Sequence, residues 1–332
     1  MYGLDILVQK VLLMTVLVFL GLIMRKANKL DGKIAKGFGD TVIYLSQPAM
    51  IIYSFLEVDF NVRTLITALC VLGFALVFHL LYFLIAFSLY KNAPDKQRTV
   101  LRFATVFTNA GFMGIPLISE LISPEAAIYA TFYVVAFNIF NWSFGCYLFT
   151  NDKSYISAKK MLLNPSTIPT YIGFAIYLIA GLCTMPDFLR PVIDNFLVPV
   201  IQNDVLYLLK CTVMPLSMTM IGIRLAEADF KTMFKDKYLP LFIGVRLIAI
   251  PLGIMAIMKL ILISGIIPAS IIVPAATVLV ISSSTPAAAM ANIFAERFNG
   301  NAVYASKLVS VSTLISMLTM PLIAALLSIV IK

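Results

Sequence analysis

The sequence contains few charged residues and a single histidine. Only 12% of its 332 residues are Asp, Glu, Lys or Arg, whereas a soluble globular protein carries roughly 25%. No CxxC or Cys/His spacing occurs, which argues against a zinc site or a structural disulfide. A phosphate loop and a nucleophile–base pair are also missing, so we expect neither an enzyme nor a cofactor. The cysteines stand singly at Cys70, Cys146, Cys183 and Cys211.

Apolar residues, by contrast, make up 61% of the chain, and the mean hydropathy is +0.97. This composition predicts an all-α polytopic membrane protein. About ten apolar segments are long enough to span a bilayer. They lie at residues 5–24, 38–57, 65–90, 98–121, 126–150, 166–184, 197–226, 238–263, 268–295 and 301–331. The first segment lacks the features of a signal peptide, so we expect it to remain as the first span.

Basic residues concentrate in every second connection between these segments. The loops after segments 1, 3, 5, 7 and 9 hold 17 of the 25 Lys and Arg, whereas the opposite loops and the C-terminus hold three. The positive-inside rule therefore predicts that the first set is cytoplasmic and that both termini are extracytoplasmic. The net charge of +9 then reflects membrane topology, and no nucleic-acid partner is expected.

Two apolar segments are interrupted by polar residues, small residues and a proline. The fourth reads TNAGFMGIPL from Thr108 to Leu117, and the ninth reads SSSTPAAAMA from Ser282 to Ala291. Non-helical backbone is tolerated at membrane depth only where protein or a water-filled cavity covers it. Broken segments at corresponding places in two halves are the best sequence indication of a transporter's binding site.

The two halves also repeat each other. Three matches at offsets between 167 and 175 support a repeat of five segments: Pro48 with Pro215, Pro116 with Pro286, and residues 126–140 with 301–315. Because five is odd, the second copy must enter the membrane from the other side, which gives a 5+5 inverted repeat. We predict a first repeat at residues 1–150, a cytoplasmic linker at 151–164 and a second repeat at 165–332.

Each break should leave a half-helix whose first N–H groups carry partial positive charge. If the two breaks cross, these N-termini form a site for an anion such as a carboxylate. An alternative stays open, in which Gly and Pro only kink the helices and Ser and Thr bond to their own backbone. The predicted substrate-binding residues are Asn109, Gly111, Gly114, Ser283, Ser284, Thr285, Asn138 and Lys307, with Pro116 and Pro286 at the helix breaks; no metal ligand is predicted.

Charged residues inside spans are functional candidates by default. Lys210, Arg246 and Lys307 lie within or near the ends of spans, and no carboxylate lies at the middle of one. Cations without core acids favour an anionic substrate over cation exchange. Arg246 and Lys307 have an equally good alternative, in which they extend to the cytoplasmic interface. His79 is interpreted as a structural residue.

With these residues in view, the chain resembles the auxin efflux carrier family, whose bacterial members include malate and malonate permeases. The resemblance rests on residues 109–117, on Met214-Pro215-Leu216 with Gly222, and on the stretch from Thr285-Pro286 to Pro321. It implies ten helices, with helices 4 and 9 crossing at their prolines, and contact between Asn109 and the substrate carboxylate. It also implies a dimerising scaffold from helices 1, 2, 6 and 7 and an elevator-like transport domain from helices 3–5 and 8–10.

We therefore predict a secondary transporter of small organic anions, with carboxylates as the favoured class, that acts as a homodimer in a bacterial inner membrane. The short linker makes auxin itself a poor candidate substrate. Two alternatives remain: a sodium-coupled bile-acid-type symporter or antiporter, and a membrane sensor that binds an anion without moving it. The substrate, the direction of transport and any coupling ion stay open.

Overall fold

The protein is nearly all-helical. The computed structural model describes residues 4–164, 167–182, 191, 193–227 and 236–331, and these contain no β-strand. The prediction of an all-α polytopic membrane protein is therefore confirmed. Six helical stretches are long and apolar enough to cross a membrane: Val8–Lys26, Val62–Leu89, Pro124–Thr150, Val198–Glu227, Leu239–Ser264 and Ala302–Val330. Cys183, Arg190, Lys231 and Lys235 lie outside the described residues.

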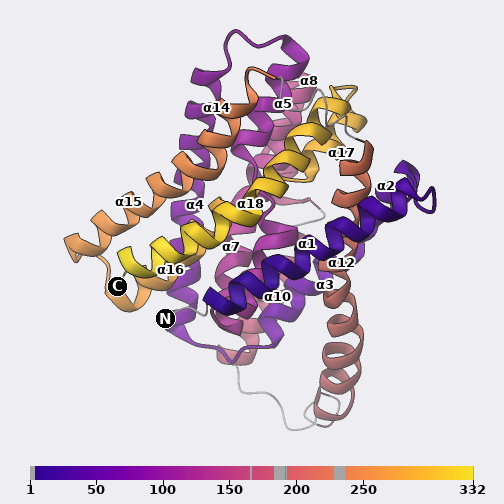
Figure 1. The fold of residues 1–332 in the computed structure, drawn as a ribbon. Coiled ribbons are helices and arrows are strands. Elements are labelled where there is room, and N and C mark those ends of the chain that lie inside the picture. The colour runs from indigo at the N-terminus through magenta and orange to yellow at the C-terminus, as the bar shows by residue number, and fades with distance from the viewer. Residues whose placement is uncertain (1–3, 165–166, 183–190, 192, 228–235, 332) are drawn as a thin grey trace.

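The first half begins with one long helix, drawn in indigo in Figure 1. Several of its later segments contain wider π-helical turns. Its elements are α1 (Leu4–Lys26), α2 (Gly32–Thr41), η1 (Val42–Ser46), α3 (Gln47–Leu56), α4 (Val62–Leu89), α5 (Asp95–Val106), η2 (Ala110–Gly114), α6 (Ile115–Leu121), α7 (Pro124–Phe140), η3 (Asn141–Gly145) and α8 (Cys146–Thr150). The predicted linker holds η4 (Lys153–Tyr155) and α9 (Ala158–Leu162).

The second half likewise consists of α-helices and π-helical turns. Its elements are α10 (Ile168–Leu182), η5 (Ile193–Leu206), α12 (Tyr207–Glu227), α14 (Leu239–Ile243), η6 (Gly244–Ala249), α15 (Ile250–Ser264), α16 (Ala269–Ser284), α17 (Met290–Arg297) and α18 (Ala302–Val330). Each of the ten expected segments is mainly helical over its described part, and the fourth and ninth are interrupted at residues 107–109 and 285–289. The count of ten spans, their inverted relation and the domain boundaries stay predictions.

Three of the π-helical turns end two residues before a proline. Pro48, Pro116 and Pro251 stand in the first turn of α3, α6 and α15, which follow η1, η2 and η6. A proline ring clashes with the preceding helical turn and offers no N–H, so a wider turn before it relieves the clash. The prolines thus set where these membrane segments bend.

Helix α1 packs along α12, and glycines permit the close approach. A Cβ atom on Gly222 would lie 1.9 Å from the carbonyl oxygen of Val18, and one on Gly21 would lie 2.2 Å from that of Thr219. Small residues allow such contact between membrane helices, where packing rather than water exclusion drives association. α12 also packs on α2 and α3, and α3 packs on α10.

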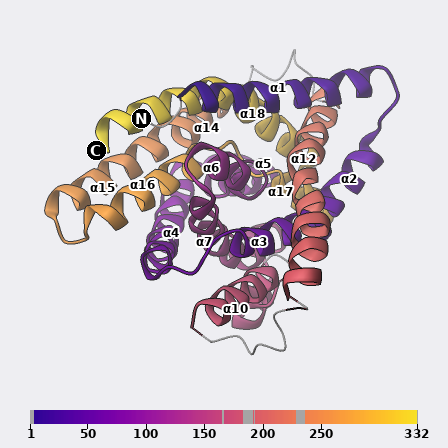
Figure 2. The same ribbon diagram turned by 90° about the horizontal axis from the view of Figure 1, so that it is seen from below.

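The remaining helices surround the two broken segments. α16 packs against α4, α7 and α15, while α6 packs on α7 and α17 packs on α18. Figure 2 shows α6 and α7 between α12 on one side and α16 on the other. The division into a scaffold and a transport domain stays a prediction.

Candidate functional site at the crossed helix breaks

The two broken segments meet through a short antiparallel bridge. Beyond the end of α5 at Val106, Thr108 pairs with Ala287, which follows the end of α16. The N–H of Asn109 donates to the carbonyl of Pro286 at 2.8 Å, and the N–H of Ala288 donates to that of Phe107 at 2.9 Å. Each break therefore satisfies backbone groups of the other, as membrane depth requires.

After the bridge, each segment starts a new helix beside the same small cavity. η2 and α6 continue from Ala110, and α17 starts at Met290. The cavity is lined from the first break by Asn109, Gly111 and Phe112 and from the second by Ala288, Ala289 and Met290. The first N–H groups of a helix have no acceptor within it and carry partial positive charge, so two positive helix ends converge here.

The cavity wall also carries side-chain N–H donors that have no partner. These are Nδ2 of Asn109, Asn138 and Asn141 and Nε1 of Trp142, all buried; Oδ1 of Asn141 is unpartnered as well. No carboxylate lines this cavity among the residues that the structure describes. Its volume is about 20 Å³, which is room for one water molecule. The arrangement is a compact, donor-rich and uncharged site.

The structure brings three of the predicted binding residues to this cavity. Asn109 and Asn138 are each 3% exposed, and Gly111 lines the cavity beside Gln47. Gly114 lies further along the helix, where a Cβ atom would meet Ala110 at 3.4 Å, and it does not line the cavity.

The predicted polar residues of the ninth segment face their own helix. Ser283 Oγ donates to the carbonyl of Val280, Ser284 Oγ to that of Ile281, and Thr285 Oγ1 to that of Ser282, each at 2.8 Å. Each hydroxyl has one proton to donate, and none of the three side chains lines the cavity. For these hydroxyls the alternative stated above, bonding to their own backbone, describes the structure.

Lys307 lies away from the crossing. Its Nζ pairs with Oδ2 of Asp236 at 3.3 Å, beside a separate surface cavity that Asn92 and Tyr238 also line. Burial opposes ionisation of Asp236, but the N–H of Tyr238 and the side chains of Tyr304 and Lys307 outweigh it and lower the pKa of this carboxyl. The geometry thus gives Lys307 a carboxylate partner near a helix end.

Several cavity residues were absent from our predicted set. Gln47, Asn141, Trp142 and the stretch 288–290 line the cavity. Gln47 precedes Pro48 just after the π-helical turn η1 of the second segment. Its Nε2 lies 2.5 Å from the position that a Cβ atom on Gly111 would take. An amide beside a proline in a membrane segment is a signal that sequence analysis could have used.

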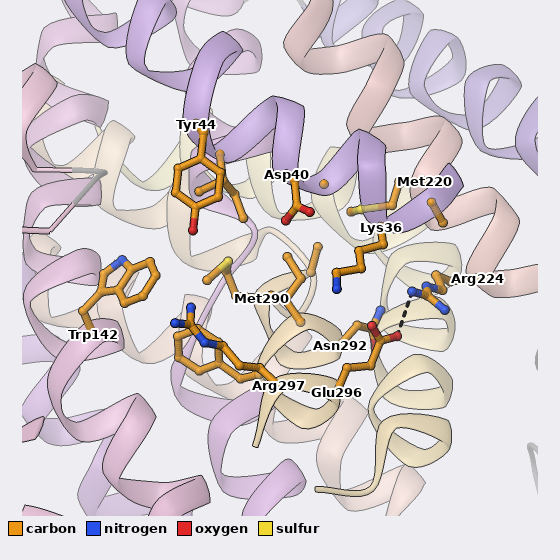
Figure 3. A pocket seen from close by; sticks show the side chains of 16 residues that line it. Lys36, Asp40, Tyr44, Trp142, Met220, Arg224, Met290, Asn292, Glu296 and Arg297 are labelled. Carbon is orange, nitrogen blue, oxygen red and sulfur yellow. Dashed lines mark ion pairs between the residues drawn. The ribbon is translucent and has the colours of Figure 1, made fainter. Parts of the chain in front are cut away.

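A larger cavity of about 540 Å³ connects the site to the side with the basic loops. It shares Ile43, Trp142, Ala289 and Met290 with the small cavity. Figure 3 shows Lys36 and Asp40 of α2 and Arg224 of α12 facing Glu296 and Arg297 of α17 across it. Nη2 of Arg224 pairs with Oε1 of Glu296 at 2.7 Å, which links α12 to α17.

A second cavity of about 540 Å³ lies at the other end of the broken segment. Tyr53, Glu57, Pro116 and Lys210 line it, and Lys210 pairs with Glu57 at 3.4 Å and lies 3.8 Å above the ring of Tyr53. This cavity shares no lining residue with the site. Of these two larger cavities, the one on the side of the basic loops is thus the one that adjoins the site.

Comparison with known proteins matches residues 6–324 to a family model described as membrane transport protein. The chain belongs to this family, the auxin efflux carriers. The resemblance found in the sequence is thereby confirmed at the level of the family, and the malate-permease-like subtype stays a prediction. A search of curated proteins found no match. The family assignment makes the chain a multi-pass membrane transporter, which agrees with its crossed, broken helices.

Proposed function

We propose that this transporter moves small organic anions, with carboxylates as the main class. A carboxylate oxygen would take the place of the one water that the cavity at the crossing can hold, and the rest of the anion would lie in the adjoining cavity of about 540 Å³. The observation that carries the proposal is the convergence of four unpartnered N–H donors and two helix N-termini around one cavity without a carboxylate. Hydrogen bonds to an ionised acceptor are shorter and about twice as strong as those between neutral groups. A site with many donors and no acid therefore favours a carboxylate over a cation.

The two larger cavities support transport by alternating access. The site shares four lining residues with the cavity that holds Arg224 and Arg297, whereas the cavity beside Lys210 and Pro116 shares none with it. The proposed movement carries the crossing along the packed surfaces of α3 and α12 until it opens beside Lys210. This is an elevator-type step, and it requires the ion pair between Arg224 and Glu296 to break.

We further propose a homodimer in a bacterial inner membrane, with the basic loops on the cytoplasmic side. The positive-inside distribution of Lys and Arg supports the orientation. The tight α1–α12 contact supports a rigid body against which other helices could slide.

Counterflow in proteoliposomes tests the proposal. Vesicles loaded with unlabelled malonate, malate, succinate or acetate are mixed with the same compound in radiolabelled form outside. We expect transient accumulation of label for at least one carboxylate, with no requirement for a sodium gradient. Binding without counterflow would identify a sensor instead, and accumulation only with sodium would identify a coupled symporter or antiporter.

A further inference from the structure

Arg246 is a fully buried cation beside the crossing. It lies on η6, is 0% exposed, and heads the fully buried side chains by size among the described residues. Its Nη2 donates to the carbonyl of Ser283 at 2.7 Å and to that of Thr285 at 3.0 Å. The guanidinium therefore does not reach the membrane interface, which was one of the two interpretations of the sequence.

The two acceptors of Arg246 belong to the C-terminal end of the half-helix α16. α16 ends at Ser284, and the last carbonyls of a helix carry partial negative charge and lack N–H partners. A guanidinium offers five donors in a fixed fork, so one side chain can satisfy several such carbonyls. Arg246, which lies on η6, thus holds the end of α16 in place.

The charge of Arg246 is not neutralised by a neighbour. No carboxylate among the described residues pairs with it, and its Nε and Nη1 have no hydrogen-bond partner. Among the described residues, the titratable side chains that interact electrostatically with Arg246 are His79, Tyr82 and Tyr133. None of these carries a carboxyl group. A charge at membrane depth is costly, and one that persists is a functional candidate.

The guanidinium of Arg246 and the N–H of Asn109, a cavity residue, bind the carbonyls of two successive residues. Arg246 binds the carbonyl of Thr285, and the next carbonyl, of Pro286, accepts the N–H of Asn109. Two or three peptide units therefore separate the charge from the cavity wall, a distance on the order of 10 Å. At an effective dielectric constant of about 20, a unit charge at that distance changes the affinity for an anion roughly tenfold.

We propose that Arg246 is a positioning and specificity-determining residue. It fixes the break of α16, and its unpaired charge makes the cavity prefer an anion over an uncharged compound of the same shape. This inference rests on the proposed function, because it assumes that a carboxylate occupies the cavity. It adds the residue that supplies the positive charge, which the cavity lining itself lacks.

Trp142 provides a binding assay, because it is the only tryptophan of the chain and lines the cavity. Purified wild-type protein, R246Q and R246K are titrated with malonate, malate, succinate and acetate and with the corresponding amides. For R246Q we expect the dissociation constant of the carboxylate to rise about tenfold while that of the amide stays within about twofold. R246K, which keeps the charge, should retain the preference for the carboxylate.

Thermal unfolding of each variant shows whether it is folded. If R246Q does not fold, R246M takes its place, since an apolar side chain needs no partner there; if neither folds, the preference of R246K alone decides. Equal weakening of acid and amide, or carboxylate affinity of the neutral variant equal to wild type, would overturn the inference. A wild-type protein that responds to no carboxylate contradicts the proposed function instead.

Discussion

The two helix breaks look alike in sequence but contribute to the site in different ways. The first turns the side chain of Asn109 into the cavity and brings Gly111 to its wall. The second turns its hydroxyls back onto α16 and reaches the cavity only with residues 288–290. Its polar residues serve the helix end, where Arg246 binds the carbonyls. One break thus offers side-chain donors and the other mainly backbone, so a repeated pattern need not carry repeated chemistry.

The difference has a local physical cause. Ser283 and Ser284 are still within α16, where a serine hydroxyl readily bonds to a carbonyl three or four residues earlier. Asn109 stands two residues beyond Phe107, the C-cap of α5, and although it is the N-cap of η2 its side chain makes no capping hydrogen bond. Position relative to the helix end therefore decides which polar residues face the cavity.

The largest expected effect is that of Asn109→Ala, and Ser284→Ala serves as its control. Removing the Asn109 amide deletes a buried donor to a charged acceptor, and carboxylate counterflow should fall about 100-fold in kcat/KM. Ser284→Ala removes a hydroxyl that bonds only to its own helix, so transport should stay within about twofold. The comparison is measured in proteoliposomes with matched protein content, and equal losses in both variants would abolish the distinction between the breaks.

Gly111→Ala should have the next largest effect. The added Cβ would lie 2.5 Å from Nε2 of Gln47, so the amide must move into the cavity or away from it. We expect roughly a tenfold loss of carboxylate affinity, as for a modestly overpacked site. The double variant Gly111→Ala/Gln47→Ala should recover part of it. Titration of Trp142 fluorescence measures both, and an unchanged affinity in Gly111→Ala would place the ligand elsewhere.

Breaking the ion pair between Arg224 and Glu296 tests whether α17, which follows the second break, moves against α12. These side chains are 17% and 36% exposed, and a pair of this kind contributes about 0.2–1 kcal/mol. Glu296→Gln should therefore shift the balance of the two open states about two- to fivefold, and the swap Arg224→Glu/Glu296→Arg should restore it. Labelling of a cysteine introduced at Asn292, in a protein without other cysteines, reports opening on the basic side; labelling that is identical in all three proteins would argue against this movement.

The smallest effect concerns Asp236 and Lys307, which lie outside the site. Because the pKa of Asp236 is lowered in the folded protein, its stabilising contribution is present above the ordinary pKa of an aspartate and is lost as the pH falls through the lowered value. Asp236→Asn should lower the unfolding temperature slightly at neutral pH and not at all at strongly acidic pH. Carboxylate transport by the Asp236→Asn variant should be unchanged. A large loss of transport would instead support the prediction that Lys307 belongs to the binding site.

Sequence analysis could predict the segments and the breaks, because hydropathy and proline act locally. Pro286 lies at the crossing, where its carbonyl accepts the N–H of Asn109, whereas Pro116 lies beyond it in the first turn of α6. The roles of Ser284 and Arg246 could not be read in this way. They depend on the extended backbone of Thr285, at φ −63° and ψ 153°, and on its position against η6, which only the tertiary structure sets.

The central claim is that the donor-rich cavity at the crossing holds the carboxylate. An experimental structure with a bound brominated dicarboxylate tests it most directly, because anomalous scattering locates the bromine without interpretation of weak density. The account predicts the bromine beside Asn109 and Asn138. A single bromine between Tyr53 and Lys210, or among Lys36, Arg224 and Arg297, with the crossing left empty, would contradict it.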